Sequence, residues 1–260
     1  MNVAKLRSIK TTIRDDEIDM QDASVDIWDK KYRLKDKHMD PIDHDIAATY
    51  RRVAMALARV EDPEQSGFWQ DRFEWALQHG AIPAGRIISN AGAQEYKPST
   101  STINCTVSGI VPDSMRGILE SNLEAGLTLK AGCGIGYEFS TLRPKGAYVS
   151  GAGAYTSGPL SFMDIFDKMC FTVSSAGGRR GAQMATFDVS HPDVFDFVRA
   201  KREDGRLRQF NLSLLITEEF INAVQDNRNW DLTFPITAKE VENGLNLNDE
   251  KIVWKSFPTS

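Results

Sequence analysis

Residues 103–139 read INCTVSGIVPDSMRGILESNLEAGLTLKAGCGIGYEF, and their pattern indicates the fold class. Apolar and polar residues alternate over residues 103–107, which predicts a short β-strand. Asp113 or Ser114 can then cap a helix whose apolar residues recur on one face. Residues 135–139 follow a glycine-rich loop and predict a second strand. Strand, helix and strand in this order favour parallel pairing, because the helical crossover returns the chain to the same end of the sheet.

The same rhythm continues toward the C-terminus. Helices are predicted at residues 160–173, at residues 192–202 and after Thr217, and strands at residues 184–189, 210–214 and 230–236. Alternation of this kind gives a mostly parallel sheet, either open or closed into a barrel. The predicted fold class is therefore α/β, and no further domain boundary is expected after residue 100.

The N-terminal part has a different pattern. Residues 1–44 carry many charges of both signs and few apolar residues other than Ile27, Trp28, Tyr32 and Leu34, so we interpret them as a loosely ordered arm with one short anchoring segment. Apolar residues at helical spacing predict one helix over residues 45–61, which Asp62-Pro63 would end, and a second helix up to Gly80. Residues 83–101 are rich in loop-forming residues. The predicted organisation is an arm over 1–44, a helical domain over 45–100 and an α/β domain over 101–260.

Composition and charge exclude several classes of protein. Lys and Arg total 31 and Asp and Glu total 36, a net charge of −5, which argues against a protein that grips nucleic acid by bulk charge. The sequence contains no apolar run of about 18 residues that could span a membrane and no apolar signal segment near its start. Three cysteines without CxxC spacing exclude a disulfide scaffold and favour a reducing, cytoplasmic setting. The four histidines lack metal-ligand spacing, so no metal site is predicted.

Three glycine-containing loops are candidate ligand sites. SNAG (Ser89–Gly92) lets the backbone approach a ligand, although a connecting loop is the commoner explanation. AGCGIG (residues 131–136) lacks GxGxxG spacing and lies between a helix and a strand, so it is not a dinucleotide fingerprint; tight packing and ligand approach both stay open. SAGGRRGAQM (residues 175–184) is cationic, as is the LRPKG loop with Arg143 and Lys145. Two such loops in an acidic protein indicate an anionic small ligand, with solvated turns as the alternative.

The cysteines alone identify no catalytic site. Cys105 shares a strand face with Ile103 and Val107, and a single cysteine in such a position is most often a packing residue. Cys133 lies in a glycine loop and Cys170 on an apolar helix face, so both are interpreted as structural.

Seven motifs resemble, in the same order, those of one enzyme family: RIISNAG, INC, PDSMRGI, GCGIGYEFSTLRPKG, SGPLSFMDIFD, GGRRGAQMATFDVSHPDVFDFVRAKR and FNLSLLITEEF. Together they are similar to the N-terminal half of a ribonucleotide reductase catalytic chain, from about Asp26 to Val224. DIWDKKYRL and TYRRVAMALARVE are most similar to the adenosylcobalamin-dependent (class II) type. The resemblance implies an N-terminal helical domain followed by about half of a ten-stranded α/β barrel.

The resemblance also implies residue roles. Cys105 matches one of two cysteines that deliver reducing equivalents to the ribose and then form a disulfide. The matching substrate-binding positions are Ser89, Asn90, Ala91, Gly92, Asn104, Cys133, Gly134 and Arg180. The positions matching the site of the specificity effector, a deoxynucleoside triphosphate or ATP, are Asp113, Ser114, Met115, Arg143, Lys145, Gly177, Gly178, Arg179, Gly181, Ala182 and Gln183. Ile87 stands where the family commonly has a hydroxyl residue and Ser150 where it has an arginine, so a substrate-phosphate contact and part of the effector site depart from the pattern.

The family's radical-bearing cysteine and second reducing cysteine lie further along its chain than Ser260 here. We therefore expect this chain to be inactive alone and to require a complementary C-terminal reductase chain. Adenosylcobalamin is the expected cofactor of the assembled enzyme, and a thioredoxin- or glutaredoxin-type protein the expected reductant. A homodimer is compatible with the resemblance, whereas neither a membrane nor a nucleic acid is an expected partner.

Three other functions stay open. A noncatalytic nucleotide-binding regulatory module would keep Asp113, Arg143 and the loop of residues 177–184 for sensing only. The chain could equally be the same half of a metal-radical (class I) reductase, or belong to a barrel radical enzyme without nucleotide substrates. Disulfide formation by Cys105 tests the first alternative, cobalamin dependence the second and effector binding the third.

Overall fold

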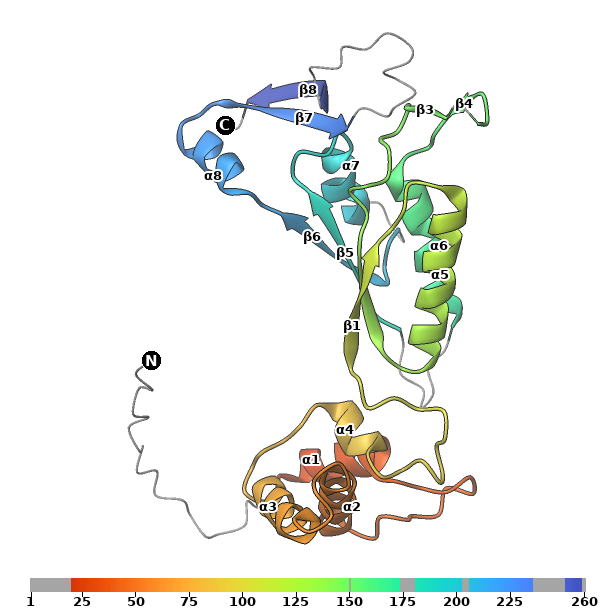
Figure 1. Cartoon of the computed structure of the whole chain (residues 1–260), viewed down its shortest axis with the longest axis vertical. Coiled ribbons are helices and arrows are strands. Elements are labelled where there is room, and N and C mark those ends of the chain that lie inside the picture. Colours follow the sequence, from red (N-terminus) through yellow and green to blue (C-terminus); the bar gives the residue numbers. More distant parts are fainter. Residues whose placement is uncertain (1–19, 150, 174–180, 203–205, 236–250, 259–260) are drawn as a thin grey trace. The chain divides into compact units, whose positions relative to one another are not determined.

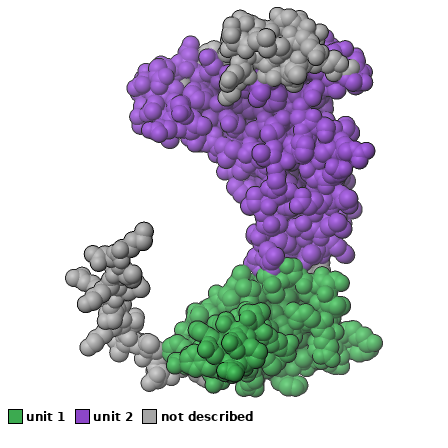
Figure 2. Space-filling model, in the orientation of Figure 1, with its two compact units in different colours: residues 1–102 green, residues 103–260 purple. Residues whose placement is uncertain are grey.

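The computed structural model describes residues 20–149, 151–173, 181–202, 206–235 and 251–258. The chain divides into two compact units, residues 1–102 and residues 103–260 (Figure 2). Each unit has its own hydrophobic core.

Unit 1 is helical. Its helices are α1 (Asp22–Ile27), which continues into a π-helical turn (Trp28–Tyr32), α2 (Ile46–Ala58), α3 (Ser66–Gln78) and α4 (Gly85–Asn90). The α2 helix begins where its sequence predicts, because the Asp45 carboxylate accepts a hydrogen bond from the Ala48 amide at 2.7 Å. The α2 and α3 helices form a pair, and the unit's small core includes Val53 and Leu77.

Residues 20–44 contain more regular structure than a loosely ordered arm, and Trp28 lies in the short anchoring segment expected from the sequence. The Trp28 indole N–H donates to Thr49 Oγ1 at 3.0 Å, which ties this segment to α2. Many of its charges are used internally; for example, Arg33 donates to the Asp29 carboxylate at 2.8 Å. Pairing of this kind removes the repulsion that a charge-rich composition otherwise indicates. The rest of the predicted arm lies outside the described residues.

The loop expected over residues 83–101 contains the α4 helix. Ser89 and Asn90 of the SNAG segment therefore end a helix, and Ala91 and Gly92 follow it. A helix of six residues is too short to produce a recognisable apolar period, which is why the sequence did not reveal it.

A four-stranded parallel sheet forms the centre of unit 2. Its strands are β1 (Cys105–Ile110), β2 (Gly134–Glu138), β5 (Gln183–Asp188) and β6 (Phe210–Leu215), in the order β1-β2-β5-β6. They are connected by α5 (Met115–Lys130), α6 (Pro159–Thr172) and α7 (Val194–Arg199), the last followed by a 3₁₀ turn (Ala200–Arg202). Figure 1 shows α5 and α6 side by side along one face of the sheet. The predicted fold class is confirmed: a helical region precedes a partial parallel-sheet α/β region.

Aromatic side chains fill the space between the sheet and these helices. Tyr137 of β2 and Phe139, the residue after this strand, are buried, and each makes an edge-to-face contact with Phe166 of α6, at centroid distances of 5.1 and 5.3 Å. The Tyr137 hydroxyl donates to Gln183 Oε1 at 3.0 Å, so its one polar atom is satisfied inside the core.

The remaining elements of unit 2 lie outside the parallel sheet. Thr217 caps α8 (Glu218–Gln225), as predicted, by accepting a hydrogen bond from the Phe220 amide at 3.3 Å. The predicted strand at residues 230–236 exists as β7 (Asn229–Pro235), but it pairs antiparallel with β8 (Lys251–Pro258). A small hairpin, β3 (Tyr148–Val149) with β4 (Ala154–Tyr155), was not predicted. Among the described residues, no helix is long and apolar enough to cross a membrane.

Candidate functional site

One face of the parallel sheet carries the candidate reducing cysteine. Successive residues of a strand point to opposite faces, so buried Tyr137 faces the helices and Gly134 faces the other way. The parallel register pairs Cys105 with Gly134, which puts the thiol on the face opposite α5 and α6. The register continues across β5 and β6, and we call this set the open face: Cys105, Gly134, Gly136, Met184 and Asn211.

The Cys105 thiol is exposed, contrary to the buried packing role that its strand position suggested. Its strand, β1, lies at the edge of the described sheet. The sulfur sits 3.4 Å from the point where a Cβ on Gly134 would stand. Glycine at position 134 therefore lets the neighbouring strand lie close to the thiol without a side chain between them.

The other two cysteines are buried. The Cys133 thiol donates to the Gly134 carbonyl at 3.4 Å. Burial, together with the Asp167 carboxylate, raises the pKa of the Cys170 thiol to about 11, so it stays protonated and unreactive. Both observations agree with the structural interpretation of Cys133 and Cys170.

A buried ion pair, Arg52 with Asp43, contacts the backbone of the SNAG segment and of Ile88 before it. Arg52 of α2 donates to the Ala91 carbonyl at 2.5 Å and to the Ile88 carbonyl at 3.0 Å. The same guanidinium donates to the Asp43 carboxylate at 2.8 Å. Gly92 adopts φ +73°, and a Cβ there would stand 2.9 Å from Arg52 Cγ, so glycine is required by both conformation and space.

Asp43 carries the counter-charge of this cluster. Burial raises the pKa of its carboxyl group. Hydrogen bonds from Arg52 and Thr49, together with the Arg52 charge, lower the pKa by a larger amount, so the net shift is downward. The cluster was missed in the sequence, where Arg52 stands beside apolar positions of an ordinary helical pattern. The available sequence signal was an arginine directly before the apolar residues Val53 and Ala54, which are buried in the structure; a charged residue at such a position indicates a buried ion pair.

The structure brings Asp113 and Arg143 together. Arg143 Nε donates to Asp113 Oδ2 at 2.8 Å, and the Arg143 amide donates to Asp113 Oδ1 at 3.2 Å. Ser114 caps α5 by accepting a hydrogen bond from the Gly117 amide at 3.1 Å, and Met115 beside it is exposed. The Arg143 side chain is 25% exposed and is bonded to Asp113, which precedes the start of this sixteen-residue helix; a cation beside a helix N-terminus suits an anionic ligand.

The predicted effector positions of residues 177–183 do not form one described site. Gly177, Gly178, Arg179 and the substrate-binding Arg180 lie outside the described residues. A Cβ on Gly181 would stand 2.7 Å from the Cys170 sulfur, so this position packs against α6. The Ala182 carbonyl accepts a hydrogen bond from the Ile135 amide at 3.2 Å. Gln183 is 2% exposed, and its amide bonds to Tyr137 and to the Phe166 carbonyl, so the structure gives it a core role instead of a ligand contact.

Two models of known protein families match the sequence of this chain. The family model "Ribonucleotide reductase, barrel domain" matches residues 103–252, and "Ribonucleotide reductase, all-alpha domain" matches residues 19–96. The chain belongs to the ribonucleotide reductase large-subunit family. The all-alpha match covers most of unit 1 of the chain, and the barrel match most of unit 2.

Named relatives support the assignment. A "Vitamin B12-dependent ribonucleoside-diphosphate reductase" of Mycobacterium tuberculosis is 36% identical over 92% of this reductase chain and 34% of its own length. The protein of the same name from Thermoplasma acidophilum is 34% identical over 67% of the chain and 22% of its own length. A "Ribonucleoside-diphosphate reductase subunit alpha" of Helicobacter pylori is 28% identical over 81% of the chain and 26% of its own length. The chain thus spans about a third or less of these relatives.

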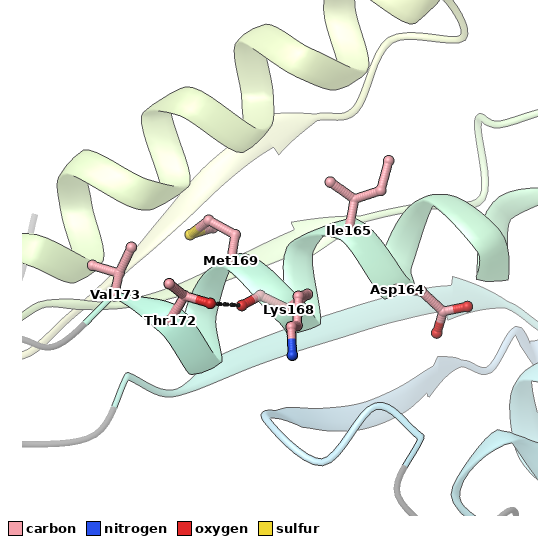
Figure 3. A pocket seen from close by; sticks show the side chains of 6 residues that line it. All are labelled: Asp164, Ile165, Lys168, Met169, Thr172 and Val173. Carbon is pink, nitrogen blue, oxygen red and sulfur yellow. Dashed lines mark hydrogen bonds between the residues drawn. The ribbon is translucent and has the colours of Figure 1, made fainter.

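A groove lies on α6. It measures about 590 Å³ and is lined by Asp164, Ile165, Lys168, Met169, Thr172 and Val173 (Figure 3). Its walls are mostly apolar, and the Thr172 hydroxyl is already bonded to the Lys168 carbonyl at 2.8 Å. A corrin ring with many amide side chains needs a larger set of polar partners. The lining of this groove therefore does not fit cobalamin.

Proposed function

We propose that this chain forms the N-terminal catalytic part of a ribonucleotide reductase and that Cys105 is one of its two reducing thiols. The exposed position of this thiol on the open face is the observation that carries the proposal. A thiol that must reach a ribose and then a partner cysteine needs access, which buried Cys133 and Cys170 lack. The names of the relatives support a ribonucleoside diphosphate as substrate, with the triphosphate as the alternative.

The proposed reaction replaces the ribose 2′-hydroxyl by hydrogen. A radical on a cysteine outside this sequence would remove a ribose hydrogen atom and return it at the end of the turnover, which restores the radical. The 2′-hydroxyl takes up a proton and leaves as water. Cys105 and a second cysteine supply two electrons and two protons, one proton for this water and one for the new C2′–H bond, and form a disulfide. A thioredoxin- or glutaredoxin-type protein reduces this disulfide for the next turnover. In the assembled enzyme, adenosylcobalamin would supply the radical.

The proposed substrate-binding groups are mostly backbone. In unit 1 they are Ser89, Asn90, Ala91 and Gly92, which Arg52 holds in place. In unit 2 they are Asn104, Cys133, Gly134 and Arg180. The Asn104 carbonyl accepts a hydrogen bond from the Gly134 amide at 2.9 Å, which fixes the backbone beside Cys105. Fixed backbone next to a reactive thiol supports positioning of the ribose.

We propose that Arg143 and Asp113 form the core of the specificity site for a deoxynucleoside triphosphate, with ATP as the alternative effector. Arg143 would bind phosphate, and Asp113 would accept hydrogen bonds from the sugar or base. Two observations support this arrangement: Arg143 is bonded to Asp113, and Ser114 caps the start of α5 directly after Asp113. Ser114, Met115 and Lys145 complete the described part of the proposed site.

A homodimer through α5 is part of the proposal. Four apolar residues spaced four apart on this helix are each at least half exposed: Met115, Leu119, Leu123 and Leu127. A stripe of this kind on a sixteen-residue helix is costly in water and favours a partner surface. The rest of the barrel, supplied as a complementary chain, is the other proposed partner, because β1 presents an open edge in the described sheet.

A reductase assay tests the proposed function. This chain is mixed with a chain carrying the C-terminal half of the barrel, with and without adenosylcobalamin and reductant. We expect deoxyribonucleotide only in the complete mixture, and we expect Cys105→Ser to abolish multiple turnover. Thr106→Ser on the same strand is the matched control and retains activity. Product formation at the normal rate by Cys105→Ser contradicts the proposal.

A regulatory module is the second candidate, because the Asp113–Arg143 pair is complete without any contribution from Cys105. An inactive complete mixture in which dTTP or dATP still binds this chain would favour it. Activity with a metal-radical partner subunit and without cobalamin would instead favour the class I type.

A further inference from the structure

The Leu142–Lys145 turn is held at both ends by one segment, the loop between β5 and α7. At one end, His191 Nε2 lies 2.9 Å from the Leu142 carbonyl oxygen. At the other end, the Lys145 amide donates to Asp193 Oδ2 at 2.8 Å. Arg143 lies between these two points, and its guanidinium donates to Asp113. Two residues that the sequence did not single out therefore fix the backbone on either side of Arg143.

The hydrogen bonds of His191 define its protonation state. Its Nδ1 accepts from the Asp193 amide at 3.0 Å, so the proton must be on Nε2, which donates to the Leu142 carbonyl. The ring is 2% exposed and lies 4.5 Å from the Phe187 ring and 5.4 Å from the Phe234 ring. Burial lowers the pKa of His191 more than the Leu142 carbonyl and the Asp193 and Asp188 carboxylates raise it, so the imidazole is neutral.

We propose that His191 is a positioning residue for the effector site: with Asp193, it fixes the Leu142–Lys145 turn so that Arg143 presents its guanidinium to a deoxynucleoside triphosphate. The inference rests on the proposed function of Arg143 and adds the device that orients it. We call these two contacts, His191 to the Leu142 carbonyl and Asp193 to the Lys145 amide, the clamp. Both contacts are to the backbone of the turn, so neither His191 nor Asp193 needs to touch the nucleotide. Fixing a cation before binding lowers the entropic cost of ordering it.

Two conservative variants separate this role from simple packing. Asparagine places a polar atom where histidine has Nδ1, so His191→Asn keeps the acceptor for the Asp193 amide but cannot reach Leu142. Glutamine places its amide nitrogen where histidine has Nε2, so His191→Gln keeps the donor to Leu142. A packing role predicts that both variants behave alike, because both remove the ring from between Phe187 and Phe234.

The test is the dissociation constant of dTTP, dATP, dGTP and dCTP for the 260-residue chain, measured by calorimetry. We expect His191→Asn to weaken the best-bound nucleotide by about tenfold or more, and His191→Gln to stay within about threefold of wild type, the scale of one buried hydrogen bond. His38→Asn removes a histidine of unit 1 and is the matched control with unchanged binding. Equal weakening by both His191 variants, or none by either, overturns the inference.

Hydrogen exchange separates this inference from the effector proposal. The amides of Arg143 and Lys145 donate to Asp113 and Asp193, and we expect both to exchange faster in His191→Asn than in His191→Gln. If wild type binds none of the four nucleotides, the effector proposal fails, and faster exchange in His191→Asn alone still supports the clamp. Unchanged exchange in both variants contradicts the clamp whatever the binding result.

Discussion

The Cys105 sulfur lies 3.4 Å from the point where a Cβ on Gly134 would stand, one strand away in the parallel sheet. This relationship makes the glycine a determinant of thiol access. We expect Gly134→Ala to fold normally, since the contact is at ordinary van der Waals distance, but to slow alkylation of Cys105 by a small reagent such as iodoacetamide.

Gly136→Ala is the control for this prediction. Its Cβ would stand 3.7 Å from Met184 Cβ on the same open face, away from the sulfur. An alkylation rate that drops equally in both variants would show that access to Cys105 does not depend on the absence of a side chain at position 134. The rates are compared by mass spectrometry of the native chain after timed exposure.

The Asp43–Arg52 pair predicts a large stability effect in unit 1. Asp43→Asn keeps the shape of the side chain but leaves the buried Arg52 guanidinium without its counter-charge. Breaking a buried pair in this way costs about 3–5 kcal/mol of unfolding free energy. Urea unfolding, followed by hydrogen exchange within α2, measures the change.

An exposed pair in unit 2 provides the comparison. Arg228 contacts Asp226 at 3.2 Å with both side chains more than half exposed. Arg228→Gln is therefore expected to cost no more than about 1 kcal/mol. Equal losses for Asp43→Asn and Arg228→Gln would show that the buried cluster does not anchor the SNAG segment.

Gly117 predicts a steric requirement at the start of α5. A Cβ there would stand 2.5 Å from Pro112 Cβ, a distance that backbone movement must relieve. We expect Gly117→Ala to destabilise unit 2 by about 1–3 kcal/mol, as overpacking usually does. Gly109→Ala, where no atom lies within 4 Å, should leave the unfolding midpoint nearly unchanged. A midpoint that is also unchanged in Gly117→Ala would mean that Pro112 does not pack against the helix as described.

His191 predicts an acid dependence of stability in unit 2. Its folded pKa is lowered from 6.5 by burial, so the unfolded chain binds the proton more readily. Stability contributed by neutral His191 is full above pH 6.5 and is lost as the pH falls from there toward the lowered folded pKa. Unfolding free energies across this window should decline in wild type and decline less in His191→Gln.

The Asp43 carboxyl acts in a separate range. Its pKa is lowered from 3.8, so its contribution to unit 1 is lost only as the pH falls below that value. Mildly acidic conditions should therefore weaken unit 2 before the Asp43 cluster of unit 1 is affected. Simultaneous loss of amide protection in both units near pH 6 would contradict this order.

Local chemistry made much of the fold predictable. The Ser114 and Thr217 caps lie where the sequence predicts them, because capping involves residues only three positions apart. The order of strands and helices in unit 2 likewise follows from periodicities within single elements. The resemblance to reductases rested on contiguous motifs of the same local kind.

Long-range pairing was not predictable in this way. Arg52 holds the Ala91 carbonyl across 39 residues, and His191 holds the Leu142 carbonyl across 49. Nothing in the residues next to Arg52 or His191 specifies these partners. The antiparallel partner of β7 and the exposure of Cys105 depend in the same manner on elements distant in sequence.

The most direct test of the central claim is the state of Cys105 after a single turnover. The assembled reductase is given ribonucleotide and adenosylcobalamin but no external reductant, then quenched with an alkylating reagent and mapped by mass spectrometry. We expect one equivalent of deoxyribonucleotide and Cys105 in a disulfide. Formation of product with Cys105 still alkylated as a free thiol would contradict it.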